Sequence, residues 1–191
     1  ISALCHKAVY NSMESRREHL NDFHLNVAGE YVYDGALYAC QSDDAKQHRI
    51  KRAVLGMAAI LIVAVIAGGC IPAPGMQNCF YVLLPYLGEF LGAGSVIWAL
   101  AKLGMDWGTV REYNYKKSVA VLPVRTAVTA VFSLLGIVCE LIFFFVNDHA
   151  GQTFFALLYV LLKLTALLSA LVLRAEIMQA EWDKLPKKDN S

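Results

Sequence analysis

Three charged side chains lie inside long apolar stretches of this sequence: Glu89, Glu140 and Lys163. A charge at the centre of a membrane-spanning helix costs about 2.5–3.5 kcal/mol on insertion scales, so such residues normally face other helices or water. Two carboxylates and an ammonium group could pair and fix how the helices pack. They could instead line a polar cavity that moves protons or small solutes. These three residues are therefore the candidate intramembrane polar site.

The depth of each residue indicates which of them can meet. Glu89 and Lys163 each lie about ten residues from the outer end of their apolar stretch, or roughly 15 Å at the helical rise. Glu140 lies about six residues from its outer end, roughly 9 Å by the same rise. The matched depths predict a Glu89–Lys163 pair, with Glu140 within reach of the long lysine side chain. If the pair is structural, we expect Glu140 to bond to hydroxyl groups or to carry a proton.

Four apolar stretches contain these residues and dominate the chain. Each is long enough for a helix to cross a hydrocarbon core about 30 Å thick, which takes about 20 residues. With 57% hydrophobic and only 17% charged residues, a soluble domain could not hide four such stretches. We therefore expect an all-α integral membrane protein whose residues 49–174 form a four-transmembrane-helix bundle. The expected spans are 53–71, 79–101, 121–146 and 153–173.

Small and polar residues recur at helical spacing in three of the spans, which favours close helix packing. They form one stripe in each span. Glu140 and Lys163 belong to two of these stripes, and Glu89 directly follows Gly88 of the third. The charges should therefore face the seam between the helices. The stripes are Pro85, Gly88, Gly92, Ser95 and Ala99; Thr126, Thr129, Ser133, Gly136 and Glu140; and Tyr159, Lys163, Ala166 and Ala170.

Basic residues outside the spans predict the orientation of the bundle. The connections 72–78 and 147–152 contain no Lys or Arg, whereas the segment before the first span, the connection 102–120 and the tail are rich in them. Because cationic loops stay in the cytoplasm, both termini should be cytoplasmic in a multi-pass protein of the cell membrane. Arg125, near the inner end of its span, and Trp107 are expected to anchor the chain at the headgroups.

The segment 1–48 is expected to form a small cytoplasmic unit. Its apolar residues recur at helical spacing to about Leu20, which predicts an amphipathic helix. Asp34-Gly35 between Tyr- and Val-rich flanks then predicts a β-hairpin, since a type I′ turn needs positive φ at both central residues. Beyond the last span, residues 174–183 are expected to extend the helix into the cytoplasm, within a tail that covers 175–191.

Cys70 and Cys79 flank the first outer connection, where a disulfide is geometrically plausible. The alternative is two apolar thiols at helix ends. No nucleotide-binding loop, dinucleotide fingerprint, zincin motif or serine-hydrolase elbow is present. We therefore expect no catalytic residues, no cofactor, no metal site and no nucleic-acid partner.

Function is predicted only as a class. The first hypothesis is a non-enzymatic structural, accessory or regulatory membrane subunit. Its expected partners are the lipid bilayer and either a second copy of the chain or another membrane protein. The alternative is a small transporter or channel component that works through Glu89, Glu140 and Lys163.

Overall fold

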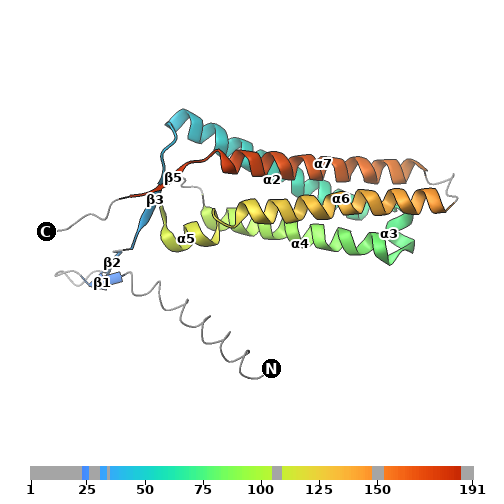
Figure 1. The fold of residues 1–191 in the computed structure, drawn as a ribbon, viewed down its shortest axis with the longest axis horizontal. Coiled ribbons are helices and arrows are strands. Elements are labelled where there is room, and N and C mark those ends of the chain that lie inside the picture. The colour runs from blue at the N-terminus through green and yellow to red at the C-terminus, as the bar shows by residue number, and fades with distance from the viewer. Residues whose placement is uncertain (1–22, 26–30, 34, 105–108, 148–152, 186–191) are drawn as a thin grey trace, which may run out of the picture.

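Four long helices form the body of the protein (Figure 1). The computed structural model describes residues 23–25, 31–33, 35–104, 109–147 and 153–185. The helices are each long and apolar enough to cross a membrane, and each contains most of one expected span. They are α2 (Asp44–Cys70), α4 (Phe80–Leu103), α6 (Leu122–Val146) and α7 (Thr153–Met178).

The helix boundaries differ from the expected ones at the polar ends. Helix α2 begins at Asp44 rather than near Ala53, because the polar residues before the span are themselves good helix formers. Helix α7 continues beyond Leu173 to Met178, as expected for an extension. The prediction that this extension reaches Asp183 is wrong, because residues Trp182–Lys184 form strand β5.

The helices pack in the order α2, α7, α6, α4, with extensive contact between successive members and a lighter contact between α2 and α4. Apolar side chains from all four helices build a continuous core. Each helix buries one apolar face in this core and leaves other apolar side chains exposed on its outer face. The most deeply buried core residues include Val54, Leu61, Val96, Leu122 and Leu173.

The predicted stripes of small and polar residues do lie at the helix seams. On α6, Thr126, Thr129 and Ser133 are fully buried. Between α4 and α6, the backbone of Gly92 lies so close to Thr129 that a Cβ on the glycine would be 2.6 Å from the threonine Oγ1. The absence of a side chain at this position therefore sets the spacing of the two helices.

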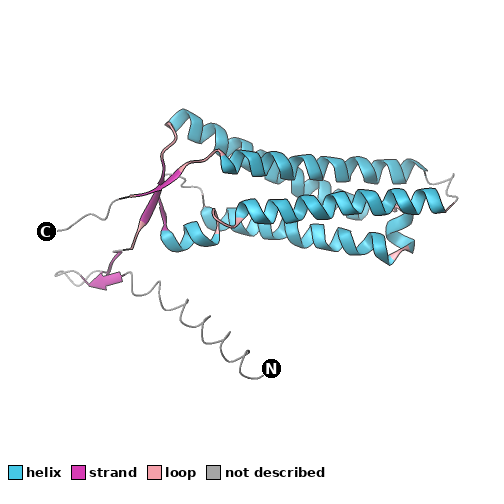
Figure 2. Ribbon diagram, viewed as in Figure 1, coloured by secondary structure: helices cyan, strands magenta, loops and turns pink. Residues whose placement is uncertain are grey.

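A three-stranded antiparallel sheet lies at one end of the bundle, which we call the sheet end (Figure 2). Strand β3 (Leu37–Cys40) is central, with β4 (Thr109–Arg111) on one side and β5 on the other. Helix α5 (Glu112–Lys117) follows β4, and its Tyr115 ring stacks on Tyr38 with centroids 4.2 Å apart. The sheet thus ties together three segments that are distant in the sequence.

The hairpin predicted at Asp34-Gly35 is wrong. Strand β2 (Tyr31–Tyr33) pairs with β1 (Phe23–Leu25), while β3 pairs with β4 and β5. The local turn signal fails because both edges of β3 are taken by strands from remote parts of the chain. The expected helix up to Leu20 lies outside the described residues.

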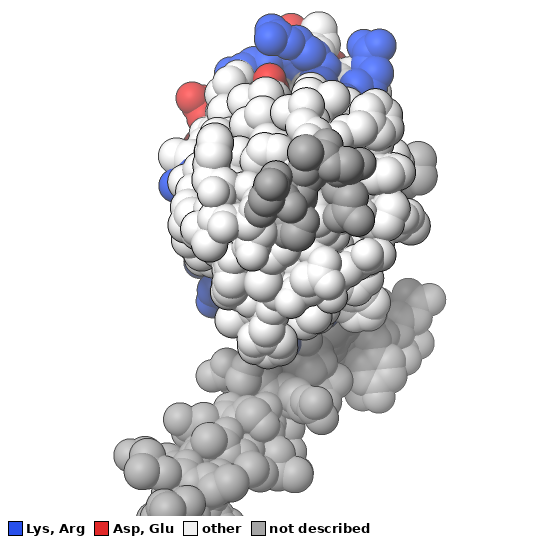
Figure 3. All heavy atoms as spheres, turned by 90° about the vertical axis from the view of Figure 1, so that its right-hand side faces the viewer, with Lys and Arg blue, Asp and Glu red and all other residues white. Residues whose placement is uncertain are grey.

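The opposite end of the bundle, which we call the α3 end, is closed by the short helix α3 (Pro74–Asn78) between α2 and α4. Proline at the start of α3 suits a first helical turn, where its missing N–H leaves no hydrogen bond unmade. Helix α3 contacts α4, α6 and α7. Figure 3 views this end, and the Lys, Arg, Asp and Glu atoms in view lie toward its rim.

The close approach at Gly92 generates a prediction. Gly92→Val should destabilise the bundle by about 1–3 kcal/mol, because the added atoms must displace Thr129 or the α6 backbone. Gly94→Val is the matched control, since it lies on the exposed face of the same helix with nothing within 4 Å of its Cβ position. The measurement is unfolding of the purified protein in detergent. Equal stability of the two variants would contradict the packing argument.

Candidate functional site

An ion pair between Glu89 of α4 and Lys163 of α7 lies inside the bundle. The ammonium Nζ donates a hydrogen bond to Glu89 Oε2. Both side chains are removed from the surface, with 0% of Glu89 and 2% of Lys163 exposed. The pairing predicted from their matched depths is therefore present in the structure. Two opposite charges in contact greatly reduce the cost of burying either one alone.

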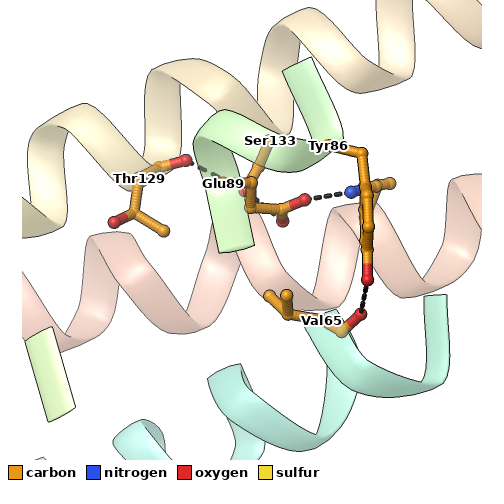
Figure 4. Close-up of polar contacts among 6 residues, drawn as sticks. Val65, Tyr86, Glu89, Thr129 and Ser133 are labelled. Atoms are coloured by element: carbon orange, nitrogen blue, oxygen red, sulfur yellow. Dashed lines mark hydrogen bonds and ion pairs between the residues drawn. The ribbon is translucent and has the colours of Figure 1, made fainter. Parts of the chain in front are cut away.

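The second carboxylate oxygen of Glu89 is bound by α6. The Ser133 hydroxyl donates to Glu89 Oε1 at 2.6 Å and also lies 3.1 Å from the Thr129 carbonyl oxygen. Figure 4 shows Glu89 pointing toward Ser133 across the seam between α4 and α6. Both oxygens of the carboxylate thus have a partner, and the two partners come from different helices.

Two aromatic rings cover the ammonium of Lys163. Its Nζ lies 4.5 Å from the ring centroid of Tyr86 and 5.0 Å from that of Tyr159. A cation is attracted to the face of an aromatic ring, most strongly where water is excluded. The Tyr86 hydroxyl lies 3.5 Å from the carbonyl oxygen of Val65 on α2, so all four long helices contribute to this region (Figure 4).

Sequence reasoning did not identify Tyr86 as part of the site. The signal was available, because Tyr86 precedes Glu89 by one helical turn and therefore shares its face. Gly69 on α2 also contributes to the site, because a Cβ at this position would collide with the Tyr86 hydroxyl. That contact joins α2 to α4, and no spacing within one helix could reveal it.

Glu140 does not join the ion pair. It is fully buried, and the backbone N–H of Gly75 on α3 donates to its Oε1 at 3.4 Å. Its Oε2 has no hydrogen-bond partner among the residues that the structure describes, and neither has the buried hydroxyl of Tyr159. The structure therefore places Glu140 beneath α3, whereas the sequence alone placed it within reach of Lys163.

The other predicted site residues have separate roles. Cys70 and Cys79 are free thiols in the structure, which agrees with the alternative of two thiols at helix ends rather than with the candidate disulfide. The connection between α2 and α4 is not a simple turn, because helix α3 is inserted between the two cysteines. Arg125 donates from Nη1 to the Ser95 carbonyl oxygen at 2.7 Å, which ties α6 to α4 near the sheet end. Trp107 lies outside the described residues.

The charged and polar groups of the cluster are bound to one another. Glu89 and Lys163 neutralise one another, and Ser133 is occupied as a donor to Glu89. Nucleophilic catalysis would need a nucleophile bonded to a free general base, and Glu89 is not free. An apolar pocket does exist, but it lies at the sheet end and is lined by Leu100, Leu103, Val119, Leu122, Ile177, Ala180 and Trp182.

A double-mutant cycle tests the role of the ion pair. Lys163→Met should destabilise the protein by about 3–5 kcal/mol, because it leaves the Glu89 carboxylate buried without a counter-charge. Adding Glu89→Gln should recover part of that loss, since the stranded charge is then removed. Unfolding in detergent measures all four corners of the cycle.

Lys46→Met is the matched control for this cycle, because Lys46 is exposed at the start of α2. It should change the stability by no more than about 0.5 kcal/mol. Additive effects of the Lys163 and Glu89 substitutions would contradict the assigned coupling. So would a Lys163→Met variant as stable as the Lys46→Met control.

No protein-family model, no curated protein and no solved structure matches this chain.

Proposed function

We propose that this chain is a multi-pass membrane protein that acts as a non-enzymatic structural, accessory or regulatory subunit. The observation that carries the proposal is the closed geometry of the Glu89–Lys163 pair. The two charged groups bind each other, the Glu89 carboxylate also accepts a hydrogen bond from Ser133, and two aromatic rings cover the Lys163 ammonium. All four long helices contribute to this region. A pair held in this way fixes which helix faces meet. It offers no free charged group to a substrate.

The outer faces of the helices support the assignment to a membrane. Large apolar side chains are exposed along every long helix. Soluble proteins rarely expose a contiguous apolar surface larger than a few hundred Å². A lipid environment would remove this surface from water. Examples with at least half of their area exposed are Val63, Leu91, Val131 and Leu161.

We further propose that both termini are cytoplasmic. The described basic residues outside the spans gather toward the sheet end, where α2 starts and α4 and α7 finish. By contrast, Pro72–Asn78 at the α3 end contains no charged residue. Two arginines also suit a boundary at the sheet end: Arg125 donates to the Ser95 carbonyl, and Arg174 donates to the Pro123 carbonyl at 3.0 Å.

The sheet is the part best suited to contact a partner, either a second copy or another membrane protein. It joins the segment before α2, the connection between α4 and α6, and the segment after α7 into one unit. Strands β4 and β5 form its two edges, and an edge strand can accept a strand from another chain.

Thiol labelling tests the orientation. In intact host cells, a membrane-impermeant thiol reagent should modify the exposed Cys70 at the α3 end. A cysteine placed at the sheet end by Lys46→Cys, in a background whose native cysteines are all replaced, should react only after the membrane is permeabilised. The reverse pattern would contradict the proposed orientation. Labelling of both positions in intact cells would contradict a membrane-spanning arrangement.

A transporter or channel component is the second candidate, and one observation favours it. Glu140 Oε2 and the Tyr159 hydroxyl are buried and have no hydrogen-bond partner among the described residues. Native proteins rarely leave a buried polar group without a hydrogen bond, so each unpaired group calls for an explanation. Helix–helix packing alone does not require them.

Flux and assembly measurements separate the two candidates. If the chain is a structural subunit, vesicles containing it should pass protons no faster than protein-free vesicles. It should also form a complex of fixed stoichiometry in mild detergent, and Glu140→Gln should leave that complex intact. Proton flux that Glu140→Gln abolishes in folded protein would favour the transporter. A lone monomer without flux would contradict both.

A further inference from the structure

Charge balance singles out Glu140 among the buried groups of the bundle. Among the described residues, three buried side chains can carry a formal charge at neutral pH: Glu89, Glu140 and Lys163. The one ammonium is already paired with Glu89. If Glu140 were ionised, the described part of the bundle would hold one uncompensated negative charge. Burying such a charge costs several kcal/mol even after the surroundings relax.

The described groups around Glu140 do not supply the missing positive charge. Tyr81 of α4 and Tyr159 of α7 interact with it electrostatically, and both are acidic groups. Cys139 is its neighbour on α6, and Lys163 of α7 is engaged with Glu89 of α4. Helix α3 contributes no titratable side chain. Within the described part of the chain, the one donor to the carboxyl is the Gly75 N–H at 3.4 Å, a long hydrogen bond.

We propose that Glu140 is a proton-binding site that opens at the α3 end, and that α3 closes over it when the proton is bound. The proton resides on Oε2, the oxygen that has no partner in the structure. A metal cation would need several ligands, and the described residues contain no group of three or more His, Cys, Asp or Glu side chains that could hold one. A single proton needs no such group, so it is the ligand that fits.

The contact with α3 explains why the proton is held. Gly75 packs so closely that a Cβ on it would collide with Glu140 Oε2 and lie 3.1 Å from the Phe143 ring. Water therefore cannot hydrate a carboxylate there while α3 is docked. When α3 lifts, the O–H bond on Oε2 breaks, its electron pair stays on the carboxylate, and the proton passes to a water molecule. Redocking requires the proton to return.

The sign of the pH dependence follows from this linkage. The docked form holds one more proton than the open form, so docking is favoured at low pH and weakens as the pH rises. This inference goes beyond the proposed function, because a structural subunit and a transporter could both carry such a site. It predicts motion at the α3 end while the Glu89–Lys163 pair stays intact.

Two native cysteines can report the motion of α3. Cys79 directly follows α3 and is partly buried, whereas Cys70 is exposed at the end of α2. In the full-length protein in detergent, the thiol-labelling rate of each cysteine is measured by mass spectrometry. The Cys79 rate is divided by the Cys70 rate to remove the general effect of pH on thiols. We expect this ratio to rise with pH, by at most about tenfold per pH unit for one released proton.

Variants separate this proposal from general loosening. Glu140→Gln keeps the size of the neutral acid without a proton to lose, so its ratio should stay flat with pH. Gly75→Ala should raise the ratio at every pH, because its Cβ pushes α3 away from Glu140. Gly68→Ala is the matched control near the end of α2, since nothing lies within 4 Å of its Cβ position.

Several results would overturn the proposal. A ratio that does not change with pH in the wild type would do so, as would the same pH dependence in Glu140→Gln. A ratio set by sodium or potassium concentration at fixed pH would indicate a cation site instead of a proton site. Infrared spectroscopy of the wild type gives an independent check: at neutral pH it should show the C=O stretch of a protonated carboxyl group, and its absence would exclude a proton on Glu140.

Discussion

The need to neutralise charge inside an apolar bundle organises this protein. Glu89 and Lys163 are tolerated because each is the other's counter-ion, and because Ser133 binds the remaining carboxylate oxygen. These contacts join α4 to α6 and to α7, and Tyr86 extends the arrangement to α2. Purely apolar helices could slide or rotate against one another at little cost. The pair fixes one register, because any other would strand a buried charge.

Small residues make this pairing geometrically possible. Gly92 lets α4 approach Thr129 of α6, and the space at Gly69 receives the Tyr86 hydroxyl from α4. Large side chains then serve a different purpose: the rings of Tyr86 and Tyr159 cover the Lys163 ammonium. The glycines let the helices approach one another, and the aromatic rings cover the charge that lies between them. The lighter contact between α2 and α4 makes Tyr86 especially important on that side.

The sequence could predict what depends on helical periodicity, and it could not predict what depends on remote contacts. Apolar length located the four long helices, and matched depth along them led from Glu89 to Lys163. The partners of β3 come from far along the chain, so the local Asp34-Gly35 signal suggested the wrong pairing. Likewise, depth alone could not show that Gly75 folds over Glu140, because no periodic pattern describes a connection between helices.

The two ends of the bundle are held with unequal strength, and this asymmetry bears on where motion can occur. At the sheet end, β3 is hydrogen-bonded on both edges, and Tyr38, Tyr115 and Trp182 form a connected group of rings. At the α3 end, five residues form the cover, and one long hydrogen bond joins Gly75 to Glu140. Elements with few contacts open at lower free energy than those tied into a sheet. This difference supports two proposals: that the sheet carries the contact with a partner, and that the α3 end moves when Glu140 gains or loses its proton.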